Sequence, residues 1–156
     1  MAKPYLYLNF IMLVPLHPAI VHFPIALITT ALILHGIQLW KPNWLGRVVG
    51  LWLMGLATIF SIAAVLTGQK EAAKAGEIGY PTETLIFIER HETLGNIVVR
   101  GSILFFVGWV YLFLKFKNDI RLDRLALAFL LLLFMIVTIS AYTGGQLVYI
   151  HGVGTP

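Results

Sequence analysis

Hydrophobic residues fall into long, nearly uninterrupted runs rather than the short alternating patterns of soluble strands and helices. Four runs approach or exceed the roughly 20 residues that a helix needs to cross the hydrocarbon core of a bilayer. They cover residues 19–39, 44–66, 94–114 and 125–142. The connections at 41–43 and 115–124 are short, so neighbouring helices should be antiparallel. The pattern predicts a single all-α domain over residues 1–156, an integral membrane four-helix bundle with up-down topology.

Two stretches fall outside this pattern. Residues 68–91 form the one long polar stretch, which we expect to be a loop outside the membrane. Residues 5–16 are apolar but too short to span, and we expect them to lie on the membrane face. On the second span, Gly46 and Gly50 have the GxxxG spacing that allows close helix packing in lipid.

Composition supports lipid as the solvent. The chain is 59% hydrophobic and 12% charged, about half of the roughly 25% charged residues in a soluble domain. The basic residues are scattered, so the net charge of +4 does not indicate nucleic-acid binding. The absence of cysteine excludes thiolate metal sites, iron–sulfur clusters and covalent haem attachment. Any bound group must be held by nitrogen, oxygen or packing.

Basic residues near the spans indicate the orientation. One side of the predicted bundle carries six: Lys41, Arg47, Lys115, Lys117, Arg121 and Arg124. The other side carries four: Lys3, Lys70, Lys74 and Arg90. The positive-inside rule places the side with six in the cytoplasm. We therefore expect a bacterial inner-membrane protein with both termini and the 68–91 stretch in the periplasm.

Four of the five histidines should gather at the periplasmic side. His17 and His22 precede or open the first span, His91 precedes the third, and His151 follows the fourth. His35 lies near the cytoplasmic end, thirteen residues and about 220° from His22, so a structural role is expected for it.

Imidazole is the common axial ligand of non-covalently bound haem and a frequent ligand of transition metals. We expect His22 and His91 to clamp a b-type haem, with His17 and His151 as a second pair or as outer partners. Gly95, Gly144 and Gly145 would offer the macrocycle a surface without side chains. On the helical repeat, Gly95 shares a face with His91, and Gly144 shares one with His151 if the helix continues that far.

Two alternatives stay open. The same four histidines could form a copper or zinc site for metal handling or oxidase assembly. The chain could also be a cofactor-free packing subunit of a larger membrane complex. No nucleophile–base pair, phosphate loop or paired carboxylate rises above chance, so the sequence does not indicate a hydrolase. We expect a non-catalytic electron-transfer subunit rather than an enzyme. Its partner would be a periplasmic electron carrier or a quinone.

Three charged residues flank or follow His91 along the chain. Glu89 and Glu92 flank His91 and could orient an imidazole, as outer-shell carboxylates do. Arg100 lies six residues inside the third span and about 180° from His91. We expect it to snorkel or to meet a neighbouring helix rather than a haem propionate.

Two motifs carry a resemblance. LHPAIVHFPIAL (16–27) and GGQLVYIHGVG (144–154), together with His91, resemble an uncharacterised family of small four-span bacterial membrane proteins, a domain of unknown function. The resemblance covers essentially the whole chain and implies His17, His22, His91 and His151 as shared histidines. Members also occur joined to Rieske-type iron–sulfur domains, which implies electron transfer without naming a cofactor.

Overall fold

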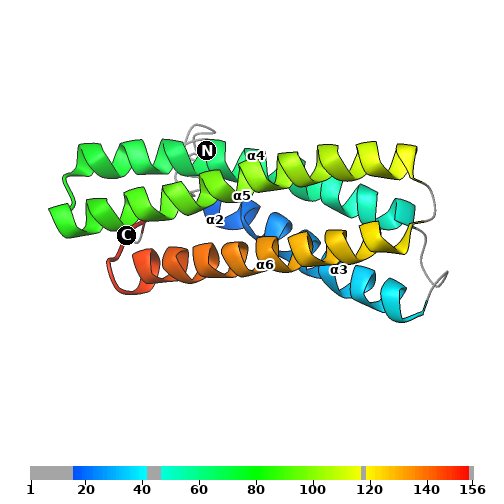
Figure 1. The fold of residues 1–156 in the computed structure, drawn as a ribbon. Coiled ribbons are helices and arrows are strands. Elements are labelled where there is room, and N and C mark those ends of the chain that lie inside the picture. Colours follow the sequence, from blue (N-terminus) through cyan, green and yellow to red (C-terminus); the bar gives the residue numbers. More distant parts are fainter. Residues whose placement is uncertain (1–15, 42–46, 117–118, 155–156) are drawn as a thin grey trace, which may run out of the picture.

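Five helices contain nearly all of the residues that the computed structural model describes, which are 16–41, 47–116 and 119–154. They are α2 (Leu16–Ile20), α3 (His22–Trp40), α4 (Arg47–Ile78), α5 (Thr82–Lys115) and α6 (Ile120–Tyr149). Four of them, α3 to α6, are long and lie side by side in an up-down bundle (Figure 1). The predicted all-α bundle is confirmed. The first predicted span covers the end of α2 and most of α3, and the described parts of the other three lie within α4, α5 and α6. The predicted membrane-face segment lies, but for Leu16, outside the described residues.

A proline separates α2 from α3. Pro24 has no N–H to donate to the carbonyl of Ile20, and its ring crowds that carbonyl. The helix breaks at Val21, one residue after Ile20, and α3 then continues to Trp40. Val21 itself keeps helical dihedrals (φ −62°, ψ −22°), and His17 lies on α2 just before the break.

The polar stretch at 68–91 is helical, and its assignment as a loop was wrong. α4 continues through the Ala-, Glu- and Lys-rich segment to Ile78, and α5 begins at Thr82. These residue types are good helix formers, so polarity here ends the membrane span without ending the helix. Gly79 closes α4 at φ +82°, and Pro81 precedes α5. The resulting α4–α5 hairpin projects beyond α6 at one end of the bundle (Figure 1).

Small residues on α4 allow close helix packing, although Gly46 of the predicted GxxxG pair lies outside the described residues. A Cβ on Gly50 would lie 3.0 Å from the indole of Trp109, and one on Gly55 would lie 3.2 Å from the ring of Phe106. Both rings come from α5. Around the bundle, α4 packs against α3 and α5, and α6 packs against the same two helices. Therefore α3 lies diagonally opposite α5, and α4 lies opposite α6.

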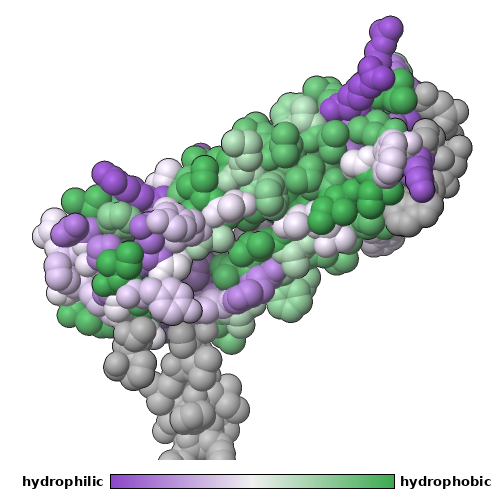
Figure 2. All heavy atoms as spheres, turned by 90° about the horizontal axis from the view of Figure 1, so that it is seen from below, coloured by the Kyte–Doolittle hydropathy of each residue, from purple (hydrophilic) through white to green (hydrophobic). Residues whose placement is uncertain are grey.

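The outer surface is suited to lipid. Many large apolar side chains are exposed along the middle of the bundle, and hydrophilic ones gather mostly at its two ends (Figure 2). Each of the four membrane-length helical segments is long and apolar enough to cross a membrane, α2 and α3 counting as one. An apolar belt of this kind is stable only when lipid covers it.

Candidate functional site

Two histidines from separate parts of the chain meet inside one end of the bundle. The ring centres of His17, on α2, and His91, on α5, lie 6.1 Å apart, with an angle of 79° between the ring planes. Both side chains are partly buried. The sequence predicted a histidine cluster at this end, and the structure identifies this pair within it.

The His17 ring is held by α4. Its Nδ1 lies 2.9 Å from the backbone oxygen of Ala64 and 3.4 Å from Oγ1 of Thr67. A carbonyl oxygen only accepts hydrogen bonds, so Nδ1 carries the proton and Nε2 of the neutral ring keeps a lone pair. The ring lies against Gly68, where a Cβ would come within 2.9 Å of Cε1. Only glycine allows α4 to approach the imidazole this closely.

The His91 ring is held in the same manner by α6. Its Nδ1 lies 3.0 Å from Oγ1 of Thr143, and that hydroxyl donates its own proton to the carbonyl of Ser140 at 2.9 Å. The Thr143 oxygen therefore accepts from Nδ1, and Nε2 again keeps a lone pair. The ring lies on Gly144, where a Cβ would be 3.0 Å from Cε1.

The pair is therefore arranged as two potential nitrogen ligands. Among the described residues, neither Nε2 forms a hydrogen bond. Two imidazoles that share one metal atom, with metal–nitrogen bonds of about 2 Å, have ring centres roughly 6 Å apart. The observed 6.1 Å matches that separation.

The other two predicted ligands lie elsewhere. His22 is exposed on α3, so the ring facing His91 is that of His17 rather than that of His22. His151 follows α6; its Nδ1 lies 3.3 Å from Oγ1 of Thr84, and its ring centre is 4.9 Å from that of Phe87. Thr84 precedes His91 by seven residues, about 10 Å along α5.

His151 lies in a tight turn that follows α6, within the C-terminal motif GGQLVYIHGVG. The N–H of Val153 returns to the carbonyl of Leu147, and Gly152 has a φ of +64°. The hydroxyl of Tyr80 reaches the carbonyl of Gly152 at 3.4 Å, which fastens the turn to the α4–α5 hairpin. The turn therefore keeps His151 against the hairpin and away from the histidine pair.

No four-histidine cluster forms in the described part of the chain. Within it, no group of three or more His, Asp or Glu side chains is placed to hold a metal ion. This arrangement disfavours the four-imidazole version of a copper or zinc site. The candidate site consists of two imidazoles, two threonine hydroxyls and two glycines.

His35 lies buried in the opposite half of the bundle. Its Nε2 donates to the carbonyl of Asp123 at 2.8 Å, and its ring meets that of Trp109 edge-on at 5.0 Å. The side chain of Asp123 pairs with Arg47. These contacts give His35 a packing role within the bundle, in line with the role expected for it.

The predicted glycines divide into three situations. Gly144 lies under His91 rather than beside His151, because α6 ends at Tyr149 and His151 follows a turn. Gly95 faces Val65 of α4, and a Cβ on Gly145 would meet nothing within 4 Å. The sequence reasoning missed Gly68, Thr67 and Thr143. Their signal is the dipeptide Thr-Gly, which occurs at 67–68 and again at 143–144.

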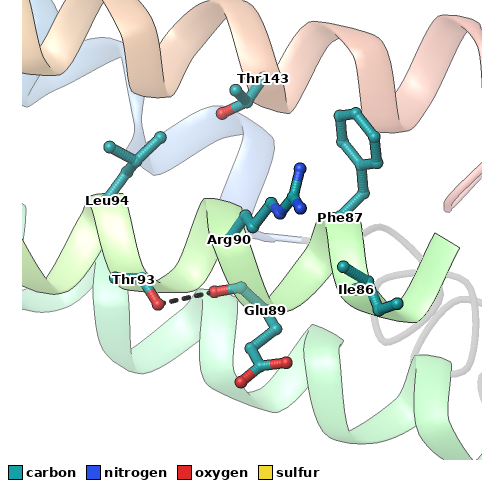
Figure 3. Close-up of a pocket in the computed structure, with 7 residues that line it drawn as sticks. All are labelled: Ile86, Phe87, Glu89, Arg90, Thr93, Leu94 and Thr143. Carbon is teal, nitrogen blue, oxygen red and sulfur yellow. Dashed lines mark hydrogen bonds between the residues drawn. The ribbon is translucent and has the colours of Figure 1, made fainter. Parts of the chain in front are cut away.

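A groove lies beside the His91 partner Thr143. It has a volume of about 570 Å³, and its lining consists of one α6 residue and six from α5: Thr143 with Ile86, Phe87, Glu89, Arg90, Thr93 and Leu94. In Figure 3 the Arg90 guanidinium points toward α6, and the Glu89 carboxylate points away from Thr143. The orienting role considered for Glu89 and Glu92 is thus filled by Thr143. Arg100 is exposed on the surface of α5.

Fold and surface define an integral membrane protein with four spanning segments and a histidine pair enclosed at one end. The chain belongs to the family described as predicted membrane protein (DUF2231), whose model matches residues 13–156. No curated protein and no solved structure matches the chain.

Proposed function

We propose that the chain is a membrane-anchored electron-transfer subunit that binds a b-type haem through His17 and His91. One observation carries the proposal: two imidazoles, each held through Nδ1, have ring centres 6.1 Å apart, close to the separation expected for two ligands of one metal atom. Each ring is fixed through Nδ1 by an outer partner, as in metal sites whose ligand histidines are held in one tautomer.

The number of ligands favours haem over a bare zinc ion. Structural zinc takes four protein ligands and catalytic zinc takes three, but the described residues bring only two side chains together. Haem iron receives four nitrogens from its porphyrin and needs only two axial ligands from the protein. The residues present therefore fit haem as a ligand set.

A single copper ion held by the same two imidazoles is the second candidate. Imidazole suits copper, and the ring separation of 6.1 Å applies equally to a bare ion between the two nitrogens. The third candidate is a cofactor-free packing subunit. The experiment below must distinguish it from the haem and copper candidates.

When bound, haem would supply reversible one-electron transfer between ferrous and ferric iron. His17 and His91 would hold the group through their imidazole nitrogens. Ala64 and Thr143 would keep the rings oriented and the Nε2 lone pairs available. Arg90, beside the site, supplies a positive charge suited to a carboxylate of the macrocycle. The chain would carry electrons without catalysing a reaction by itself.

The proposed location follows from the basic residues. The side of the bundle with six basic residues would face the cytoplasm of a bacterium. The histidine pair would then lie at the periplasmic edge of the inner membrane. The electron partner would be a periplasmic carrier or a membrane quinone, and the chain would work as a subunit of a larger complex.

An absorption spectrum of the detergent-solubilised protein tests the proposal. In protein expressed with ample haem, we expect a Soret band that shifts on dithionite reduction and sharp α and β bands of low-spin iron. The double variant His17→Ala/His91→Ala, made in the same way, should be colourless. A colourless wild type with one copper per chain would favour the second candidate, and a wild type with neither would leave the packing role.

A further inference from the structure

The buried face of α3 recurs in α5. Three buried positions on α3 have buried counterparts 74 positions later on α5: Pro24 and Val98, Ile28 and Ser102, His35 and Trp109. The fourth, Ala31, corresponds to the half-buried Phe105. The two histidines of the site, His17 and His91, are related by the same interval.

The buried face of α4 recurs in α6 at a closely similar interval. Four buried positions on α4 have buried counterparts 76 positions later: Met54 and Leu130, Ala57 and Leu133, Ser61 and Val137, Ala64 and Ser140. The Thr-Gly dipeptides at 67–68 and 143–144 keep this interval of 76. The same order of elements thus occurs twice, once through α2, α3 and α4 and once through α5 and α6.

The arrangement in space follows this repetition. In the up-down bundle α3 and α5 run in the same direction and lie diagonally opposite, as do α4 and α6. A two-fold axis along the bundle would exchange both pairs at once. Parallel repeats related by an axis along the membrane normal are an established architecture of membrane proteins, with ligand sites at the repeat interface.

Equivalent positions contact each other where such an axis would pass. The ring of His17, on α2, contacts that of His91, on α5. The ring of His35, on α3, contacts that of Trp109, also on α5. Both contacts cross the diagonal of the bundle. Arg47 pairs with Asp123, and these two are 76 positions apart on α4 and α6. Residues contact their own counterparts in this way when they lie close to a two-fold axis.

The contacts within each repeat also correspond. His17 packs on Gly68 and bonds to Ala64, while His91 packs on Gly144 and bonds to Thr143. In both repeats the threonine hydroxyl donates to the carbonyl three residues earlier. The correspondence is approximate, since His17 donates mainly to the carbonyl and His91 to the hydroxyl.

We infer that residues 16–78 and 82–149 are two copies of one helical unit, and that the ligand site lies on their shared two-fold axis with one imidazole from each copy. At the far end of the axis the paired positions hold different, complementary residues: arginine with aspartate and histidine with tryptophan. An ion pair and an edge-on ring contact stabilise the bundle directly and need no bound group. Two identical histidines at the near end suit a ligand that makes the same bond to both copies. The ligand part of this inference rests on the proposed function, whereas the repeat does not.

Distances between spin labels in the full-length protein test the repeat. The chain has no cysteine, so each introduced cysteine is a unique label site. Ile33, Val107, Ile59 and Met135 are exposed, and the repeat relates Ile33 to Val107 and Ile59 to Met135. The label pairs 33/135 and 107/59 should therefore give coincident distance distributions, as should 33/59 and 107/135. Separate peaks within either comparison would overturn the two-fold axis.

Nitrogen NMR of ¹⁵N-histidine-labelled protein, prepared free of cofactor, tests the equivalence of the two ligands. His17 and His91 should both be neutral Nδ1–H tautomers, and His35 should be the Nε2–H tautomer, which provides an internal control. A different tautomer at either His17 or His91 would overturn the assignment of matched ligands. If the distances and tautomers agree but no haem or copper binds, the repeat stands and the proposed function fails.

Discussion

At the scale of single residues, hydrogen bonding separates histidines that the sequence cannot tell apart. His17 and His91 donate from Nδ1 and leave Nε2 free, whereas His35 uses Nε2 to hold the carbonyl of Asp123. A metal bound at Nε2 needs the first arrangement, because the lone pair must be on the nitrogen that faces it. His22, exposed on α3, has no such fixed orientation among the described contacts.

Replacing the two site histidines one at a time should therefore give the same defect. In His17→Ala or His91→Ala, loss of one axial imidazole should turn the iron high-spin or release the haem. His22→Ala is the control and should retain the low-spin spectrum. Cofactor per folded protein would be measured by absorbance, with circular dichroism to establish helical content. Loss of the spectrum in His22→Ala alone would show that the wrong pair has been assigned.

The hydroxyl of Thr143 should matter through His91 rather than through the stability of α6. Thr143→Val removes the acceptor for Nδ1 at similar volume, and outer partners of ligand histidines are typically worth about 10–100-fold in affinity. Thr138→Val is a matched control, because Thr138 also bonds its own helix, at the carbonyl of Phe134, but lies on the exposed surface. Haem titration of both variants gives the affinities. Equal affinities would contradict the positioning role.

The sequence predicted the end of the bundle and the residue type of the site, but not the pair of histidines. Helical periodicity relates residues on one helix, and on that basis Gly144 was matched with His151. The contact that forms instead joins Gly144 to His91 on another helix. Such contacts depend on the rotation of each helix within the bundle and on the break after Ile20, and neither is encoded in the spacing along one helix. Thr67 and Thr143 were missed for the same reason.

At the scale of helices, hydropathy predicted the spans well and the helix ends poorly. Within the described residues the four apolar runs are helical, apart from the turn at Val21, but α4 and α5 continue well beyond them into polar sequence. A hydropathy window detects the part of a helix that crosses lipid, whereas the helix ends only where the backbone is interrupted. In this hairpin the interruption is at Gly79 and Pro81, ten or more residues past the apolar run.

Two glycines of the hairpin should respond oppositely to alanine. Gly79 has φ +82°, a left-handed conformation that costs a residue with a Cβ about 1–2 kcal/mol. Gly76 lies in the helix with open space around it, so alanine there should stabilise by up to about 1 kcal/mol. Limited proteolysis of the hairpin in detergent should be faster in Gly79→Ala and slower in Gly76→Ala. Cleavage of Gly79→Ala no faster than that of the wild type would mean that the left-handed conformation of Gly79 does not terminate α4.

At the scale of the whole molecule, the position of the histidine pair decides which compartment it serves. The apolar belt leaves hydrophilic residues mainly at the two ends of the bundle (Figure 2). The pair packs on Gly68 and Gly144, in the half of the bundle that carries the hairpin. With four spanning segments, the start of α2 and the turn that follows α6 lie on the same side as this hairpin. The side of the membrane on which the C-terminus lies therefore fixes the side of the site.

Reporter fusions to the full chain should place that end outside the cytoplasm. The opposite end carries six basic residues against four, and the positive-inside rule retains the richer side in the cytoplasm. Alkaline phosphatase, which folds only outside, should be active when fused after Pro156, and green fluorescent protein fused there should be dark. The same reporters fused after Phe116, at the other end of α5, should give the opposite pattern. Fluorescence after Pro156 would reverse the orientation, put His17 and His91 on the cytoplasmic side, and replace the periplasmic electron carrier with a cytoplasmic one.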